Sequence, residues 1–323
     1  ALQEYTELLK EEILFWKFCQ YKFYEQWKFL KQYANTRGIQ IIGDIPLYMA
    51  MDSVDVWADR KLFLLEEDGS QQHVAGSPPD NFSEGQKWGN PVYDYSYMEE
   101  HQFNWWRHRI EKNAALYDVI RIDHFLGVVR YYTIPFQEKD CCNGKWNKGP
   151  GKKLTDVMEE SAGDCRIIAD NAGSAIAGSR KLLARIGWPG SKILMFAFDG
   201  NTGNENLPHN FEENNIVVYT GTHDNDTVVG YFRDKTEYEL AYLYEYLNIG
   251  SKEEIPDALI RLAYSSIADV VIIPMQDILQ LGNEARMNQP STVGQNWKWR
   301  VGKDTLSEER RAWIRTIAAV YRR

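Results

Sequence analysis

The feature that most constrains the fold is a set of six short apolar runs separated by stretches with helical periodicity. The runs lie at 39–46, 119–123, 166–170, 193–198, 216–220 and 270–274. Helical patterns between them lie at 105–116, 175–186 and 237–247. Apolar strands that alternate with helices are typical of a parallel sheet with helices packed on it. We therefore predict an α/β protein with six parallel strands.

A closed barrel fits these strands better than an open doubly wound sheet, because no Gly-x-Gly-x-x-Gly turn follows any of them. A (β/α)8 TIM barrel has eight strands, so two are unaccounted for. The chain also opens at Ala1 inside a helical pattern, and we expect that an N-terminal part of a longer protein is absent. Residues 1–323 are predicted to form one incomplete barrel domain, with irregular loops inserted over its rim at about 65–98 and 136–165.

The N-terminal helical pattern spans residues 4–35. Its apolar residues recur at three- and four-residue steps: Leu9, Ile13, Trp16, Cys19, Phe23, Trp27 and Leu30. Such a stripe predicts a helix with one face against the core. Accordingly, Trp16, Phe23, Trp27 and Trp105 are expected to be core residues.

Composition excludes several classes of partner. The 46 acidic and 37 basic residues give a net charge of −9, and the basic residues are dispersed, which argues against nucleic acid or an anionic membrane surface. No apolar run approaches the roughly 18 residues of a membrane span. The four cysteines match neither a disulfide framework nor a zinc site, so a reducing cytoplasm is the expected location.

Carboxylates and one histidine follow the predicted strands at their C-terminal ends: Asp44, Asp123, Asp170, the pair His223-Asp224, and Asp277. The chemistry of α/β barrels lies at that end. Arg121 is two residues from Asp123, and an adjacent guanidinium is expected to keep this carboxylate ionised, as a glycosidic nucleophile must be. A purely structural Arg–Asp pair remains the alternative.

The segment around His223 and Asp224 suits a polyol, because a sugar hydroxyl both donates and accepts hydrogen bonds. An Asx-rich turn is the alternative, and a metal site fits less well because further ligands at a readable spacing are missing. Aromatic residues in predicted loops also suggest carbohydrate, because aromatic faces stack on sugar rings. They are Phe82, Trp88, Tyr93, Tyr95, Tyr97, Trp146, Trp297 and Trp299.

Motifs spread from residue 41 to residue 300 closely resemble the amylomaltases, that is, the 4-α-glucanotransferases or disproportionating enzymes. The stretches that carry the resemblance are IIGDIPLY (41–48), DSVDVW (52–57), AGSPPDNFS (75–83), QKWGNP (86–91), RIDHF (121–125), GKWNKGPG (144–151), THDNDT (222–227), ARMNQP (285–290) and NWKWR (296–300). The resemblance covers essentially the whole chain. It implies a glycosidase-type barrel and a retaining transfer of α-1,4-glucan segments, with neither metal nor organic cofactor.

By this resemblance, Asp123 corresponds to the nucleophile and Asp224 to the carboxylate that holds sugar hydroxyls and steadies the transition state. The resemblance also implies sugar-binding roles for Asp44, Arg121, His124 and His223, a lid loop that carries Asp80, Phe82 and Trp88, and a facing loop that carries Asn288 and Pro290. Maltooligosaccharides and other α-1,4-glucans are the implied partners.

One position departs from the family pattern. The family carries Ala-Glu-Asp-Leu-Gly at the end of a barrel strand, whereas this chain has Asp170 where the acid/base glutamate stands. The shorter side chain is expected to reduce activity, because retaining chemistry needs the two carboxyl groups about 5–5.5 Å apart. Two alternatives stay open, namely a catalytically impaired maltooligosaccharide-binding protein and an α-glucan hydrolase.

Overall fold

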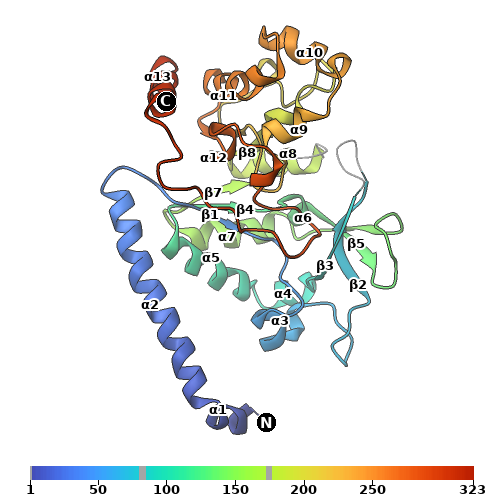
Figure 1. Cartoon of the computed structure of the whole chain (residues 1–323). Coiled ribbons are helices and arrows are strands. Elements are labelled where there is room, and N and C mark those ends of the chain that lie inside the picture. Colours follow the sequence, from blue (N-terminus) through green and yellow to red (C-terminus); the bar gives the residue numbers. More distant parts are fainter. Residues whose placement is uncertain (1, 80–84, 172–176) are drawn as a thin grey trace.

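Six parallel strands form the centre of the computed structural model, which describes residues 2–79, 85–171 and 177–323. One sheet has the order β1 (Ile42–Ile45), β4 (Val119–Ile122), β7 (Arg166–Ala169), and a second has the order β10 (Val270–Ile272), β9 (Ile216–Tyr219), β8 (Gly190–Ile193). The two sheets adjoin at β7 and β8, where the Ala169 N–H donates to the Pro189 carbonyl (3.0 Å) and Ser191 Oγ donates to the Ala169 carbonyl (3.1 Å). The strands thus follow one another as part of a barrel wall (Figure 1). This arrangement confirms the predicted incomplete barrel.

Five of the six predicted strands coincide with observed ones, and the sixth is displaced. The apolar run 193–198 was predicted as a strand, but the strand is β8 and the 3-10 helix η2 (Leu194–Phe196) follows it. Leu194 and Met195 are fully buried in a second core cluster beside β9. A short buried apolar run fits a strand and a helical turn equally well, which explains the error.

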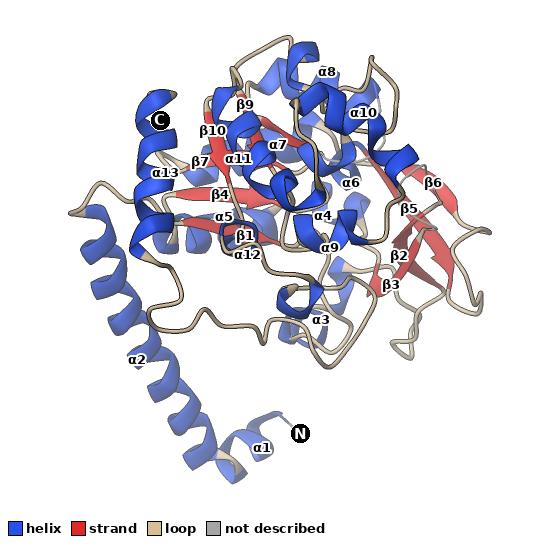
Figure 2. Ribbon diagram, turned by 45° about the horizontal axis from the view of Figure 1, so that its top comes forward, coloured by secondary structure: helices blue, strands red, loops and turns tan. Residues whose placement is uncertain are grey.

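Helices cover the outside of the wall (Figure 2). The predicted helices correspond to α5 (Asn104–Leu116), α8 (Ala177–Ile186) and α10 (Glu237–Leu247). Thr236 begins α10 with a capping box, because its hydroxyl accepts from the Glu239 N–H while the Glu239 carboxylate accepts from the Thr236 N–H. The longer helices that complete this layer are α7 (Lys152–Ala162), α11 (Ile255–Ser265) and α13 (Glu308–Val320).

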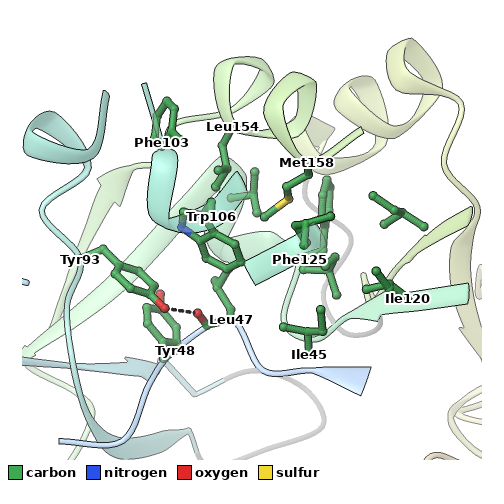
Figure 3. Close-up of a cluster of buried hydrophobic side chains, with 14 of the residues drawn as sticks. Ile45, Leu47, Tyr48, Tyr93, Phe103, Trp106, Ile120, Phe125, Leu154 and Met158 are labelled. Atoms are coloured by element: carbon green, nitrogen blue, oxygen red, sulfur yellow. Dashed lines mark hydrogen bonds between the residues drawn. The ribbon is translucent and has the colours of Figure 1, made fainter. Parts of the chain in front are cut away.

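The main core lies between β1, β4 and the helices α5 and α7. Trp106, Phe125 and Leu154 are fully buried there (Figure 3). In the same cluster, the Tyr93 hydroxyl donates to the Leu47 carbonyl (2.7 Å), so this buried hydroxyl has a partner. The core therefore fixes the segment that follows β1 and leads to the rim.

The segments 65–98 and 136–165 are more regular than predicted. They contribute β2 (His73–Ser77), β3 (Gln86–Pro91), α4 (Tyr95–Glu100), β6 (Lys145–Lys148) and α7, and β5 (Arg130–Pro135) completes an antiparallel sheet of order β3-β2-β5-β6. Gly76 makes the pairing of β2 with β3 possible, because a Cβ there would lie 2.4 Å from the Gln86 carbonyl oxygen. Gly76 lies within β2 and Pro91 ends β3, so these residues do not mark irregular loops here.

The N-terminal pattern forms α1 (Leu2–Leu8) and α2 (Lys10–Asn35), which project from the body of the molecule (Figures 1 and 2). The predicted burial of this face is wrong for Trp16 and Phe23, which are 64% and 52% exposed. Trp27 is half-buried and donates from Nε1 to the Leu116 carbonyl (2.8 Å), and Trp105 packs against the main core. Helical periodicity predicts a helix but does not show whether another element of the chain covers its apolar face.

Short helices connect the larger elements. They are α3 (Val54–Ala58), η1 (Arg60–Leu62), α6 (Leu126–Val129), η3 (Pro208–Asn210), α9 (Val228–Arg233), η4 (Lys252–Glu254), α12 (Met275–Ile278) and η5 (Asn283–Ala285). Among the described residues, no helix combines the length and the apolar character needed to cross a membrane.

Candidate active site

The site is built at the C-terminal ends of β1, β4 and β7, where three carboxylates surround one arginine. Arg121 lies on β4 and is 6% exposed. Its Nη1 donates to both oxygens of Asp44 (2.8 and 2.7 Å) and to Asp123 Oδ1 (3.1 Å). Its Nη2 lies 2.9 Å from Asp170 Oδ2. The parallel register pairs Asp44 with Arg121, so the sheet itself brings the first two side chains together.

This arrangement places one guanidinium among three carboxyl groups. Burial and, after it, the charge of Asp170 raise the pKa of Asp123 to about 8, although Arg121 opposes both effects. Burial likewise raises the pKa of Asp44 against the influence of Arg121. The expectation that Arg121 simply keeps Asp123 ionised is therefore wrong. The guanidinium is shared, and desolvation outweighs its attraction.

A second part of the site comes from the segment after β9. Asp224 Oδ1 accepts a hydrogen bond from Asn288 Nδ2 (2.6 Å), and Asp224 Oδ2 lies 3.3 Å from His223 Nε2. The same nitrogen of His223 lies 3.6 Å from Asp44 Oδ2, so this imidazole links the end of β9 to the end of β1. The alternative of an Asx-rich turn stabilised by its own side chains also holds locally, because Asn225 Oδ1 accepts from the Thr222 N–H (2.8 Å). The turn leaves the Asp224 side chain free to face the cleft.

A cleft of about 530 Å³ brings most of the predicted site residues together. Its lining includes Trp88, Asp123, His124, Asp170, Asp224, Asn288 and Pro290. Asp44, Arg121 and His223 line an adjoining hollow of about 370 Å³. Asp123 and Asp224 therefore face one common space, wide enough for a sugar unit. Asp80 and Phe82 lie outside the described residues.

His124 forms part of the cleft wall. Its φ of 50° places it in the left-handed region, which a non-glycine residue adopts only where surrounding contacts fix it. Its ring centroid lies 4.7 Å from that of Trp88 in an edge-to-face arrangement and 6.2 Å from that of Tyr48. Burial lowers the pKa of His124 to about 4. The imidazole is thus neutral near pH 7 and can both donate to and accept from a sugar hydroxyl.

Several residues singled out from the sequence do not reach the cleft. Tyr93 is a core residue, Trp146 packs on Tyr132, and Tyr97 stacks on His101. The Tyr95 hydroxyl is also buried, and Trp299 lines neither hollow. Loop position alone could not distinguish these aromatics from Trp88, which lines the cleft.

Asp277 likewise has a structural position. It is 1% exposed and accepts hydrogen bonds from Thr220 Oγ1 (2.6 Å) and the Val228 N–H (2.8 Å). It therefore ties α12 to the end of β9 and to the start of α9, at the wall of the hollow that adjoins the cleft.

Two residues at the site, Arg286 and Tyr219, were not assigned a role from the sequence, whereas Trp297 was predicted among the loop aromatics. Arg286 donates from Nη2 to the Asp224 carbonyl (2.7 Å) and from Nε to the Asn288 carbonyl (2.8 Å), and it pairs with Asp226. Trp297 packs on His223 with ring centroids 5.1 Å apart, and Tyr219 lies in the same hollow. Arg286 stands within the motif 285–290, but only the folded chain shows which groups it joins.

Comparison with known proteins identifies the family. The sequence profile described as 4-alpha-glucanotransferase matches residues 1–305. The chain belongs to the 4-alpha-glucanotransferase family. The chain is 46% identical to the 4-alpha-glucanotransferase of Clostridium butyricum over 100% of its own length, and 43% identical to that of Thermus thermophilus over 98%. It spans 66% and 65% of those two relatives, slightly less than two thirds of their length.

Solved structures agree with this assignment. Amylomaltase from Streptococcus agalactiae, solved in complex with acarbose, superposes with a TM-score of 0.94 at 42% identity, covering 100% of this chain and 66% of that one. Amylomaltase from Corynebacterium glutamicum has a TM-score of 0.74 at 18% identity and covers 89% of this chain and 46% of that one, which shows the shared fold.

Proposed function

We propose that this protein transfers segments of an α-1,4-glucan to another glucan or to glucose, by a retaining double displacement. The observation that carries the proposal is that Asp123, Asp170 and Asp224 line one cleft. Retaining glycoside transfer uses a nucleophilic carboxylate, a proton donor and groups that stabilise an oxocarbenium-like transition state. Membership in the 4-alpha-glucanotransferase family supports the proposal.

In this mechanism Asp123 attacks the anomeric carbon and the glycosidic C–O bond breaks. The leaving sugar oxygen takes a proton from Asp170, and a covalent glycosyl ester of Asp123 remains. Asp224 holds sugar hydroxyls and stabilises positive charge on the ring, in an orientation set by its hydrogen bond from Asn288. His124 and His223 bind hydroxyls of the same unit, and the Trp88 ring offers a stacking face. An acceptor hydroxyl then attacks the anomeric carbon and gives its proton to Asp170, while the ester C–O bond breaks and its electron pair returns to Asp123.

Asp170 occupies the position of the proton donor. Its side chain is one methylene shorter than glutamate, so its carboxyl group stands back by roughly one C–C bond. A displacement near 1 Å can reduce a rate on the order of a hundredfold. We therefore propose that disproportionation is slow, and that Asp170→Glu increases it.

Incubation with maltotriose tests the function. Transfer gives glucose together with a ladder of longer oligosaccharides, whereas hydrolysis gives only glucose and maltose. Asp123→Asn should abolish both product patterns. If the unmodified chain binds maltotriose and leaves it unchanged, the protein is a glucan-binding protein and the proposed transfer is wrong. If glucose and maltose are the sole products, it is a hydrolase.

We also propose a reducing, cytoplasmic location, which the four free cysteines support, and maltooligosaccharides as the partners of the cleft.

A further inference from the structure

We propose that Asp170 serves as the counter-ion of Arg121, so that the best donors for this cleft are α-glycosyl compounds whose leaving group departs without a proton. This inference rests on the proposed function, because it assumes that Asp123 is the nucleophile. It goes beyond that function by naming the class of donor that this chain should favour.

The contacts of Asp170 turn its carboxylate toward β4. Its Oδ2 lies 2.9 Å from Arg121 Nη2 and accepts the His124 N–H at 3.3 Å. The backbone is fixed on both sides, because the Asp170 N–H donates to the Ile122 carbonyl (2.9 Å) and its carbonyl accepts from the Phe125 N–H (2.8 Å). The side chain is 16% exposed and has a single methylene. The Asp170 carboxylate cannot extend farther into the cleft without losing its ion pair with Arg121.

The two terminal nitrogens of Arg121 contact different carboxylates, and this separation supports the same conclusion. Nη1 binds Asp44 and Asp123, while Nη2 binds Asp170. Asp170 thus accepts from one terminal nitrogen of a nearly buried guanidinium. Protonating Asp170 would weaken this ion pair in a site of limited solvent access. To bring a proton to a glycosidic oxygen, the Asp170 carboxyl group would also have to leave Arg121.

The consequence depends on the leaving group. When maltotriose is the donor, the glycosidic oxygen leaves as an alkoxide unless a proton reaches it as the C–O bond breaks. General-acid assistance of this kind is worth typically 10²–10⁴-fold in rate. A fluoride leaving group needs no such proton. The Asp123 carboxylate forms a bond to the anomeric carbon, the C–F bond breaks, and fluoride departs with the electron pair.

The second step can also avoid Asp170. A sugar hydroxyl must lose a proton as it attacks, whereas azide carries no proton to remove. Azide attacks the anomeric carbon of the glycosyl ester, the ester C–O bond breaks, and its electron pair returns to Asp123. The product is α-maltosyl azide, and the two steps together exchange fluoride for azide.

The test compares two donors with the full 323-residue chain: maltotriose, and α-maltosyl fluoride with azide present. Fluoride release is followed with an electrode, and products are identified by mass spectrometry. We expect α-maltosyl fluoride to react at least about 100-fold faster than maltotriose. Asp170→Glu should raise the maltotriose rate at least about tenfold, because the extra methylene lets the carboxyl group extend beyond Arg121. The ratio of the fluoride rate to the maltotriose rate should therefore fall.

Two controls make the comparison specific. Asp164→Glu makes the same side-chain change at an exposed position just before β7, and it should alter neither rate. Asp123→Asn should stop both reactions. If the unmodified chain cleaves maltotriose within about tenfold of the fluoride, or if Asp170→Glu leaves the ratio unchanged, this inference is wrong while the proposed function stands. If neither donor reacts, the proposed function fails and the inference fails with it.

Discussion

Replacing Arg121 by methionine should destabilise the folded chain mainly through charge. Arg121 is nearly buried and is the cation that Asp44, Asp123 and Asp170 all contact. Methionine keeps most of the aliphatic volume and removes the guanidinium. Three carboxylates would then lie close together without their shared counter-ion. Removing one partner of a buried pair costs about 3–5 kcal/mol. Because the side chains of Asp44 and Asp123 are about one-third exposed, 33% and 32%, we expect the lower end of that range, about 3 kcal/mol at pH 8.

The loss should depend on pH in a defined direction. The folded pKa of Asp123 is raised to about 8 from an ordinary value of 3.8. The stability that this group contributes is therefore fully present below about pH 4 and is lost as the pH rises through about 8. Removing Arg121 raises the pKa further, since the opposing attraction is gone. The variant should regain stability between pH 8 and pH 5, because its carboxylates can then take up protons.

The assay is urea unfolding of the unmodified chain and the variant at pH 5 and pH 8, followed by tryptophan fluorescence. Arg315→Met offers a matched control, because Arg315 is an exposed arginine whose nearest carboxylate, on Glu308, is 3.8 Å away. We expect the control to change the free energy of unfolding by less than about 0.5 kcal/mol at either pH. An equal loss at both pH values for Arg121→Met would show that packing, and not charge, accounts for the effect, and would refute this reasoning.

Three further predictions concern catalysis. Because Asp123 must be ionised to attack and its pKa is raised to about 8, kcat/KM for maltotriose should increase from pH 6 to pH 8.5, and a flat profile would contradict its role as nucleophile. Asn288→Ala removes the 2.6 Å hydrogen bond to Asp224, which should lower kcat/KM roughly 10–100-fold, and an unchanged value would show that Asp224 does not depend on it. Trp88→Ala should raise KM about tenfold with little change in kcat, as measured by initial rates, whereas a loss confined to kcat would argue against stacking.

The sequence predicted the positions of the strands and the rim because both follow from local patterns. A run of apolar residues followed by a carboxylate marks a strand and its end, and parallel strands align those ends. The pair of Arg121 and Asp123 was also predictable, since residues two apart on a strand point to the same side. The balance of charge around this pair was not predictable. Asp44 and Asp170 reach Arg121 from neighbouring strands, and no local pattern reveals the register that brings them there.

Burial was the least predictable property. Trp16 was predicted to be a core residue and Tyr93 to lie in a loop, yet Trp16 is exposed on α2 and Tyr93 is fully buried in the main core. Whether an aromatic side chain is covered depends on which other elements pack over it. The same limit applies to Trp88, whose place in the cleft depends on the pairing of β2 with β3, in a segment that was predicted to be an irregular loop.

The structure divides the candidate site into two halves, each organised by one arginine. Arg121 holds the carboxylates that follow β1, β4 and β7, whereas Arg286 joins the segment after β9 to the segment that carries Asn288. The roles of the two guanidinium groups differ, because Arg121 shares its charge among carboxylates that face the reaction, while Arg286 contacts the backbone of Asp224 and leaves that carboxylate to Asn288. His223, which lies near both Asp44 and Asp224, connects the halves. The contacts that set the pKa of Asp123 are therefore separate from those that place the Asp224 carboxylate. Under the proposed function, the short side chain at position 170 would slow proton transfer while the contacts of Asp224 stay unchanged.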